Sequence, residues 1–208
     1  MKKRISAFFY RLTAFTVRSI LEIVWNYKVE GRENIPPPPF SLVANHTSML
    51  DPFVIGAIFN HRLYYLAKKE LFKIPLFNPL LRWLGAIDVD RKDFKFKTWR
   101  KIQSLVKNKE IMVIFPEGTR NENPEKGLLD FKDGAATLAF MYGLTILPVG
   151  IKGTEKIWQR KQILPNIKGN IIVRIGKPIK VLKVLKPTKE QIKKLNEEIR
   201  TAILELLV

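Results

Sequence analysis

The sequence of 208 residues contains no cysteine and only two histidines. Without thiols the chain can form neither a disulfide framework nor a thiolate metal site. With two histidines, a catalytic zinc site would need an unusual shell of carboxylate ligands. We therefore expect no metal site and no bound cofactor.

The sequence also lacks a long uninterrupted hydrophobic run. Near the amino end, Arg11, Arg18 and Glu22 break the apolar stretch well below the roughly twenty residues that a membrane-spanning helix needs. Arg11 also interrupts what would be the apolar part of a secretory signal, and no convincing cleavage site follows, so we expect no signal peptide.

The same segment has the pattern of an amphipathic helix. Arg4, Arg11 and Arg18 recur every seven residues and so share one stripe. The remaining surface is broadly apolar and includes Phe8, Phe9, Leu12, Phe15, Ile20 and Ile23. We predict that residues 1–30 form amphipathic helices that lie in the headgroup plane on the cytoplasmic face of the cell membrane. The alternative is a helix that packs on its own domain.

Acidic residues are few, with 19 against 37 lysines and arginines, which gives a net charge of +18. Such a charge attracts polyanions, among which nucleic acid, anionic lipid and acidic carrier proteins all fit. Residues 94–101 interleave aromatic and basic side chains, as in a surface for single-stranded nucleic acid. As a helix, however, this segment places its apolar and basic side chains on opposite sides. We predict an amphipathic helix there and no nucleic-acid partner. A different class of function stays open, namely a basic protein that binds anionic lipid or nucleic acid without catalysis.

The chain has the length and composition of one large globular domain, with 46% hydrophobic and 27% charged residues. Four prolines in residues 31–39 form a stiff connection that marks the start of this domain, 31–208. Strands are predicted at 40–44, 63–67, 86–89, 111–115, 145–151 and 170–176, and helices at 54–59, 76–84, 93–107, 133–142 and after Thr188. Their alternation predicts an α/β domain with a mostly parallel central sheet covered by helices on both faces.

The stretch Asn45-His46-Thr47-Ser48-Met49-Leu50-Asp51 follows the first of these strands. His46 and Asp51 would point to roughly opposite sides of a regular helix or strand, so they can meet only across a turn. Ser48 can cap a helix with Asp51 in its first turn, and Pro52 is tolerated that early. The plainer alternative is an ordinary capping pattern beside a packed, neutral histidine.

A second stretch, Pro116-Glu117-Gly118-Thr119-Arg120, comes directly after the strand at 111–115. Pro116 and Gly118 end the strand and place polar side chains at its carboxyl end, where open α/β sheets bind ligands. Taken alone, this stretch could be a solvated loop with an incidental charge pair.

Together the two stretches have the form Asn-His-x-Ser-x-x-Asp followed by Phe-Pro-Glu-Gly-Thr-Arg, and this resembles the glycerophospholipid acyltransferase family. Lys69-Glu70-Leu71, Pro75 and residues 85–91 are similar to the family's middle motif, and residues 146–149 to its last. The resemblance covers residues 31–151. One departure is Asn78 after Phe77, where relatives often carry glycine.

The resemblance implies transfer of a fatty acyl group from acyl-CoA or an acyl carrier protein thioester to the free 2-hydroxyl of 1-acyl-glycerol 3-phosphate (lysophosphatidic acid), which gives phosphatidic acid at a membrane surface of anionic phospholipids. Siblings with the same motifs use glycerol 3-phosphate or another lysophospholipid. The resemblance assigns acceptor binding to Glu117, Gly118, Thr119 and Arg120. Hydrolysis of the thioester by water is a further alternative.

The chemistry of these residues suits acyl transfer. A histidine with an ordinary pKa of about 6.5 can take and return a proton near neutrality, so His46 is the expected general base and Asp51 would hold its other ring nitrogen. The sequence has no Gly-x-Ser-x-Gly motif, so an acyl-enzyme is not indicated.

Cations are needed to bind the phosphate of the acceptor. Arg91 and Arg120 each follow a predicted strand, and a guanidinium can bind two phosphate oxygens at once. Lys69 and Lys132 are weaker candidates. Asn45 and Ser48 are expected to shape the turn rather than to react.

Overall fold

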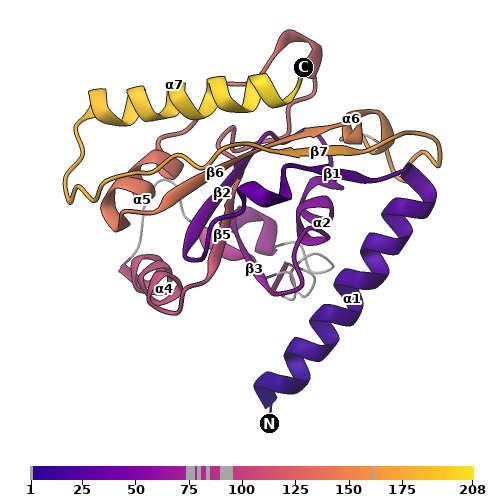
Figure 1. The fold of residues 1–208 in the computed structure, drawn as a ribbon, viewed down its shortest axis with the longest axis horizontal. Coiled ribbons are helices and arrows are strands. Elements are labelled where there is room, and N and C mark those ends of the chain that lie inside the picture. The colour runs from indigo at the N-terminus through magenta and orange to yellow at the C-terminus, as the bar shows by residue number, and fades with distance from the viewer. Residues whose placement is uncertain (1, 74–77, 79–80, 83–84, 90–95, 161) are drawn as a thin grey trace.

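The structure is a computed structural model that describes residues 2–73, 78, 81–82, 85–89, 96–160 and 162–208. Its centre is a sheet of seven strands in the order β1-β7-β6-β2-β5-β3-β4 (Figure 1). The strands are β1 (Lys28–Glu30), β2 (Phe40–Ala44), β3 (Leu63–Lys68), β4 (Ile87–Val89), β5 (Ile111–Ile114), β6 (Thr145–Lys152) and β7 (Ile172–Ile175).

All neighbouring strands are parallel except β6 and β7, which are antiparallel, so the prediction of a mostly parallel sheet is confirmed. Strand β2 lies between β5 and β6, with Val43 opposite Ile114 and Ala44 opposite Val149. The carboxyl ends of these three strands therefore meet at one edge of the sheet, and the loops that follow them lie side by side.

Helices cover both faces of the sheet (Figure 1). They are α1 (Lys2–Trp25), α2 (Asp51–Gly56), α4 (Phe96–Lys107), α5 (Gly134–Tyr142), the short α6 (Thr154–Ile157) and α7 (Lys189–Leu206). Alternate strand residues supply the two faces: Leu42 packs in the cluster with α1 and α2, whereas Val43 packs in the cluster with α4, α5 and α7. This alternation is the pattern of a sheet buried on both sides.

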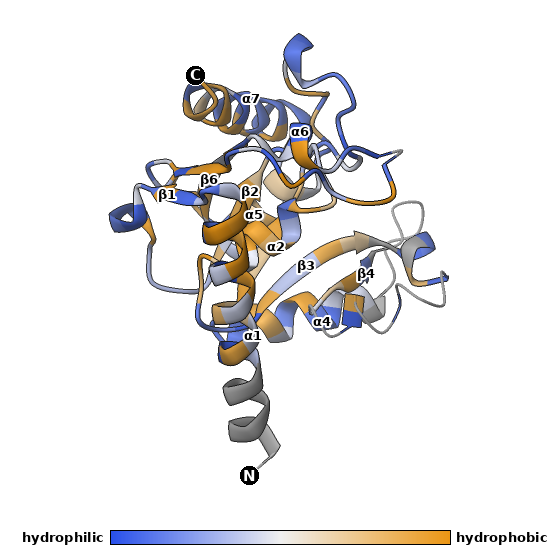
Figure 2. Ribbon diagram, turned by 90° about the vertical axis from the view of Figure 1, so that its right-hand side faces the viewer, coloured by the Kyte–Doolittle hydropathy of each residue, from blue (hydrophilic) through white to orange (hydrophobic). Residues whose placement is uncertain are grey.

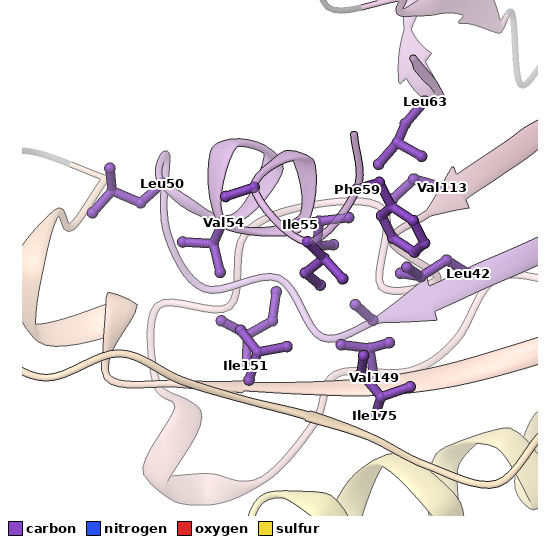
Figure 3. Close-up of a cluster of buried hydrophobic side chains, with 14 of the residues drawn as sticks. Leu42, Leu50, Val54, Ile55, Phe59, Leu63, Val113, Val149, Ile151 and Ile175 are labelled. Carbon is purple, nitrogen blue, oxygen red and sulfur yellow. The ribbon is translucent and has the colours of Figure 1, made fainter. Parts of the chain in front are cut away.

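Helix α2 packs its apolar side chains on the sheet, as Figure 3 shows for Val54 and Ile55 beside Leu42 and Val149. The helix covers Asp51–Gly56 rather than the predicted 54–59. The chain leaves the helix after Gly56, and Phe59 is buried with its ring centroid 6.3 Å from that of Phe40.

The amphipathic helix predicted at 93–107 is α4, which buries Ile102 and Leu105; Phe94 lies outside the described residues. The final helix begins as predicted, because Thr188 and Gln191 form a capping box. It buries Leu195, Ile199 and Ile203, whereas Ala202 and Leu206 are only partly covered.

The amino-terminal segment is one helix followed by a strand. Helix α1 packs Val17, Leu21 and Trp25 against the core. Strand β1, at the end of the predicted segment 1–30, pairs with β7 and so belongs to the sheet. No helix in the described part of the chain is apolar over a length that would cross a bilayer.

Further predictions lie partly or wholly outside the described residues, among them most of the helix at 76–84, Pro75 and Phe77, and the side chains of Arg4, Phe8 and Phe9. Asn78 is described, and its side-chain amide donates a hydrogen bond to the carbonyl oxygen of Phe72 at 2.8 Å. Strand β1 and helix α6 were not predicted, because each is too short to show a period.

Candidate active site

His46 and Asp51 meet across the turn that joins β2 to α2. The Nδ1 atom of His46 lies 2.7 Å from Oδ2 of Asp51. Asp51 is fully buried at the first residue of α2, and the ring of His46 is half-buried. The spacing argument is confirmed in geometry: the two side chains approach only because the chain reverses between them.

The carboxylate of Asp51 is held on both oxygens. Besides the His46 ring, Oδ2 accepts the backbone N–H groups of Thr47 at 2.7 Å and Ser48 at 2.8 Å. Oδ1 accepts the hydroxyl of Thr154 at 2.6 Å. Because a carboxylate can only accept, Nδ1 of His46 carries the proton of their hydrogen bond, and Nε2 of the neutral ring keeps a free lone pair.

Ser48 does not cap the helix, so this expectation was wrong. The residue before α2 is Leu50, and no side chain caps it. The Ser48 hydroxyl instead donates to the carbonyl oxygen of Trp158 at 2.8 Å and accepts the N–H of Leu50 at 3.2 Å. Asp51 accepts the N–H groups of Thr47 and Ser48, and the hydroxyl of Ser48 ties this turn to the chain after α6.

The side chain of Asn45 holds the end of β2, directly before His46, against β6. Its buried side-chain amide donates to the carbonyl oxygen of Ile151 at 2.8 Å and accepts the N–H of Ile151 at 2.7 Å. The side chain thus continues the pairing of β2 with β6 by one step. This agrees with a role in shaping the turn.

Glu117 links the second motif to the backbone of His46. Its Oε1 accepts the His46 N–H at 2.8 Å and its Oε2 accepts the Leu129 N–H at 2.9 Å. Burial raises the pKa of Glu117, and the two backbone N–H groups oppose this shift. Because each oxygen accepts a backbone N–H and the residue is buried, Glu117 holds the two loops together. Its role in binding the acceptor stays a prediction.

Two further contacts join this loop to His46. The Phe115 ring stacks on the His46 ring, with centroids 4.1 Å apart and planes inclined by 21°. The N–H of Asn121 donates to the carbonyl oxygen of His46 at 2.7 Å. His46 is therefore held through its ring, its N–H and its carbonyl group.

The rest of the second motif faces outward. Gly118 has φ +70°, a conformation that favours glycine, and its N–H closes the turn on Phe115. Thr119 is exposed and Arg120 half-buried. Burial, and then repulsion by Arg160, lower the pKa of Arg120, while Asp51 and Glu122 oppose the shift. Within the described part of the chain, Arg120 makes no ion pair, so its guanidinium can bind an anion.

Comparison with known proteins places this geometry in a family. A family model described as "Acyltransferase" matches residues 26–152, which is more than half of the chain and includes both motifs. The chain belongs to the acyltransferase family.

Several proteins named 1-acyl-sn-glycerol-3-phosphate acyltransferase are similar to this acyltransferase. One from Saccharomyces cerevisiae is 34% identical over 183 residues, which cover 86% of this chain and 59% of the relative. One from Bacillus subtilis is 28% identical over 95% of this chain and 96% of its own length. One from Borreliella burgdorferi is 30% identical over 88% and 75% respectively.

Among solved structures, the acyltransferase is similar to the 1-acyl-sn-glycerophosphate (LPA) acyltransferase PlsC from Thermotoga maritima. The TM-score is 0.71 at 27% sequence identity, over 95% of this chain and 80% of the other. The structural likeness thus extends over nearly the whole chain.

The other residues predicted for the site are Arg91, Lys69 and Lys132. Arg91 lies outside the described residues. Lys69 follows β3 at the same edge of the sheet as His46 and is half-buried. Lys132 is exposed, and its backbone N–H donates to Pro116 at 2.8 Å, so it lies beside the second motif. No group of three metal-binding side chains occurs among the residues that the structure describes.

Sequence reasoning missed Thr154, which lies 103 residues after Asp51 and donates to its Oδ1. Thr154 is fully buried, and its hydroxyl also lies 3.2 Å from that of Thr47. A threonine just past the predicted strand at 145–151 was visible in the sequence. What was not visible is that β6 lies next to β2, which is why the loops after these strands meet.

Proposed function

We propose that this acyltransferase transfers a fatty acyl group from an acyl thioester, of coenzyme A or an acyl carrier protein, to the free 2-hydroxyl of 1-acyl-glycerol 3-phosphate. The product is phosphatidic acid. The observation that carries the proposal is the 2.7 Å hydrogen bond from His46 Nδ1 to Asp51, at the same sheet edge as the Arg120 guanidinium. The names of the similar proteins favour this acceptor.

In the proposed reaction, Nε2 of His46 takes the proton of the acceptor hydroxyl while the hydroxyl oxygen attacks the thioester carbonyl carbon. The Asp51 carboxylate stabilises the imidazolium that forms. When the tetrahedral intermediate collapses, the carbon–sulfur bond breaks, and the leaving thiolate takes the proton from His46. The acceptor hydroxyl does the work of a nucleophilic serine, so no acyl-enzyme is required.

Arg120 is the proposed partner of the acceptor phosphate. Its guanidinium can donate to two phosphate oxygens, and the flanking Gly118 lets the backbone come close to a ligand. Thr119 is exposed on the same turn. Arg91, Lys69 and Lys132 remain predicted contributors.

Helix α1 is proposed to attach the enzyme to the cytoplasmic face of a membrane. The helix face turned away from the core exposes Leu12, Phe15, Ile20 and Ile23, with Phe15 69% and Ile23 83% exposed. Arg11 and Arg18 are also exposed on the helix. One side of α1 is thus buried in the domain, and the other has the composition of a segment that lies in the lipid interface.

The test is a product analysis with the full chain. The enzyme is incubated with acyl-CoA or acyl carrier protein thioester together with lysophosphatidic acid, glycerol 3-phosphate or no acceptor. Free thiol and lipid products are then measured. We expect phosphatidic acid to form only with lysophosphatidic acid and not with the His46→Ala variant. Thiol release without acceptor would instead indicate a hydrolase, and acylation of glycerol 3-phosphate would change the acceptor.

A further inference from the structure

The connection between α6 and β7 displays three large aliphatic side chains. Residues 158–160 and 162–170 are called the apolar loop. In it, Ile163 is 88% exposed, Leu164 74% and Ile167 77%. Single exposed aliphatic residues are common, but three within five positions form a patch that marks an interaction surface. Figure 2 shows this hydrophobic stretch after α6, on the outside of the molecule.

The polar groups of the apolar loop bond to one another. The indole N–H of Trp158 donates to the carbonyl oxygen of Gln162 at 3.0 Å, and the Gln162 amide donates to the side-chain oxygen of Asn166 at 3.0 Å. Asn166 donates its backbone N–H to Ile157 and its side-chain N–H to Lys156, each at 2.8 Å. These hydrogen bonds within the described part of the loop and to the end of α6 hold the backbone in place, while the three aliphatic side chains stay exposed.

The apolar loop is tied to two functional parts of the protein. The Trp25 indole N–H donates to the carbonyl oxygen of Asn166 at 2.8 Å, so the loop lies beside the carboxyl end of α1 (Figure 1). At its other end, the carbonyl group of Trp158 accepts the hydroxyl of Ser48, in the turn between His46 and Asp51. The apolar loop therefore bridges the carboxyl end of α1 and the turn that carries His46 and Asp51.

Basic residues flank the patch. Lys156, Arg160 and Lys168 are exposed in or next to the loop, and Arg160 pairs with Glu122 at 2.8 Å. Aliphatic side chains bordered by cations match the interface of an anionic bilayer, in which acyl chains lie beneath negative headgroups. The net charge of +18 also favours an anionic lipid surface over a protein partner as the occupant of this patch.

We propose that the apolar loop is a second membrane-contact element, which inserts Ile163, Leu164 and Ile167 into an anionic phospholipid surface beside α1. The contact would set the His46 turn at the level of the headgroups, where a lipid acceptor presents its phosphate. This consequence for catalysis rests on the proposed function, whereas binding of the loop to the membrane does not.

Vesicle binding tests the loop directly. The full chain is sedimented with vesicles of phosphatidylcholine containing phosphatidylglycerol, as wild type and as the I163S/L164S variant. We expect the partition coefficient of the variant to fall at least about tenfold, because two large apolar side chains no longer enter the lipid. The matched control is L182S/L185S, at positions 86% and 70% exposed in the segment beside Phe140, before α7. Its binding should change less than twofold.

A third variant, F15S/I23S, separates the loop from α1. If only this variant loses vesicle binding and I163S/L164S binds like the wild type, α1 is the sole contact and the loop proposal is overturned. Equal losses in I163S/L164S and L182S/L185S would also overturn it, because binding would then follow general surface hydrophobicity.

Transfer assays give the second readout. Activity of I163S/L164S on lysophosphatidic acid in vesicles should fall at least about fivefold, while activity on a short-chain acceptor dissolved as monomers stays near wild type, since only the first needs the membrane. Equal loss on both acceptors would show that the loop acts on the site itself and would overturn the proposal. If the wild type transfers to neither acceptor, the proposed function fails, and the vesicle-binding result still decides the loop.

Discussion

The two loops beside the end of β2 are built differently. In the turn from His46 to Asp51 the carboxylate is fully buried and receives four donors, so the geometry is held from every side. In the loop from Glu117 to Arg120, only Glu117 is anchored in this way, while Thr119 and Arg120 reach outward. The difference suggests a division of work: the first loop needs fixed geometry for proton transfer, and the second must admit an anion. Substitutions in the first should lower kcat, and those facing outward in the second should raise KM.

The largest expected effect is that of His46→Ala. Loss of a general base should lower kcat by about 10²- to 10⁴-fold. The fold should persist, because the backbone hydrogen bonds of His46 to Glu117 and Asn121 do not involve the ring. Steady-state transfer kinetics and circular dichroism check this. A folded variant with near-normal turnover would show that another group takes the proton.

The second-largest effect is expected for Arg120→Ala, which should weaken binding of the acceptor. Removal of charge-assisted hydrogen bonds to phosphate should lower kcat/KM by about 10- to 100-fold, mainly through the apparent KM of the acceptor. Arg120→Lys is the matched control, since it keeps the charge but loses the planar fork and should recover only part of the affinity. If the KM of the donor rises more than that of the acceptor, Arg120 serves the thioester instead.

Glu117→Gln tests the anchor between the two loops. The amide keeps one acceptor oxygen, so one of the N–H groups of His46 and Leu129 loses its partner, which should cost about 1–2 kcal/mol of stability. We expect kcat to fall several-fold with little change in the acceptor KM.

The pH dependence of this loss has a definite sign. Burial raises the pKa of Glu117 in the folded state, so the folded protein binds this proton more tightly than the unfolded chain. The resulting stability is complete below the ordinary pKa of the carboxyl and is lost as pH rises through the raised value. Denaturant unfolding from acid to neutral pH should therefore show the largest difference between wild type and Glu117→Gln on the acid side. A difference that grows toward neutral pH would contradict the assigned shift.

Thr154→Val should have the smallest effect on activity. It removes one of the four donors to Asp51 while keeping the shape of the side chain, so we expect about 1–3 kcal/mol less stability and a kcat lower by only about twofold. The acceptor KM should not change, because Thr154 acts through Asp51. Thr154→Ser restores the hydroxyl and should restore kcat; failure of this rescue would mean that the methyl group, not the hydroxyl, matters.

Much of the fold followed from local pattern. The apolar runs at 40–44 and 111–115 were recognisable as buried strands, and their alternation with helices predicted the parallel sheet. The antiparallel placement of β7 was not predicted, because the direction of a short strand depends on its pairing partner. Predictions for residues outside the described ranges, such as Arg91, stay predictions.

For the site, sequence alone determined that His46 and Asp51 can meet only across a turn and that Glu117 to Arg120 follow a strand, because both statements depend on spacing along the chain. Tertiary structure decided which loops touch. It placed β2 between β5 and β6, which brought Glu117 to the backbone of His46 and Thr154 to the carboxylate of Asp51. Strand order results from packing across the whole domain, so these long-range hydrogen bonds leave no local pattern in the sequence.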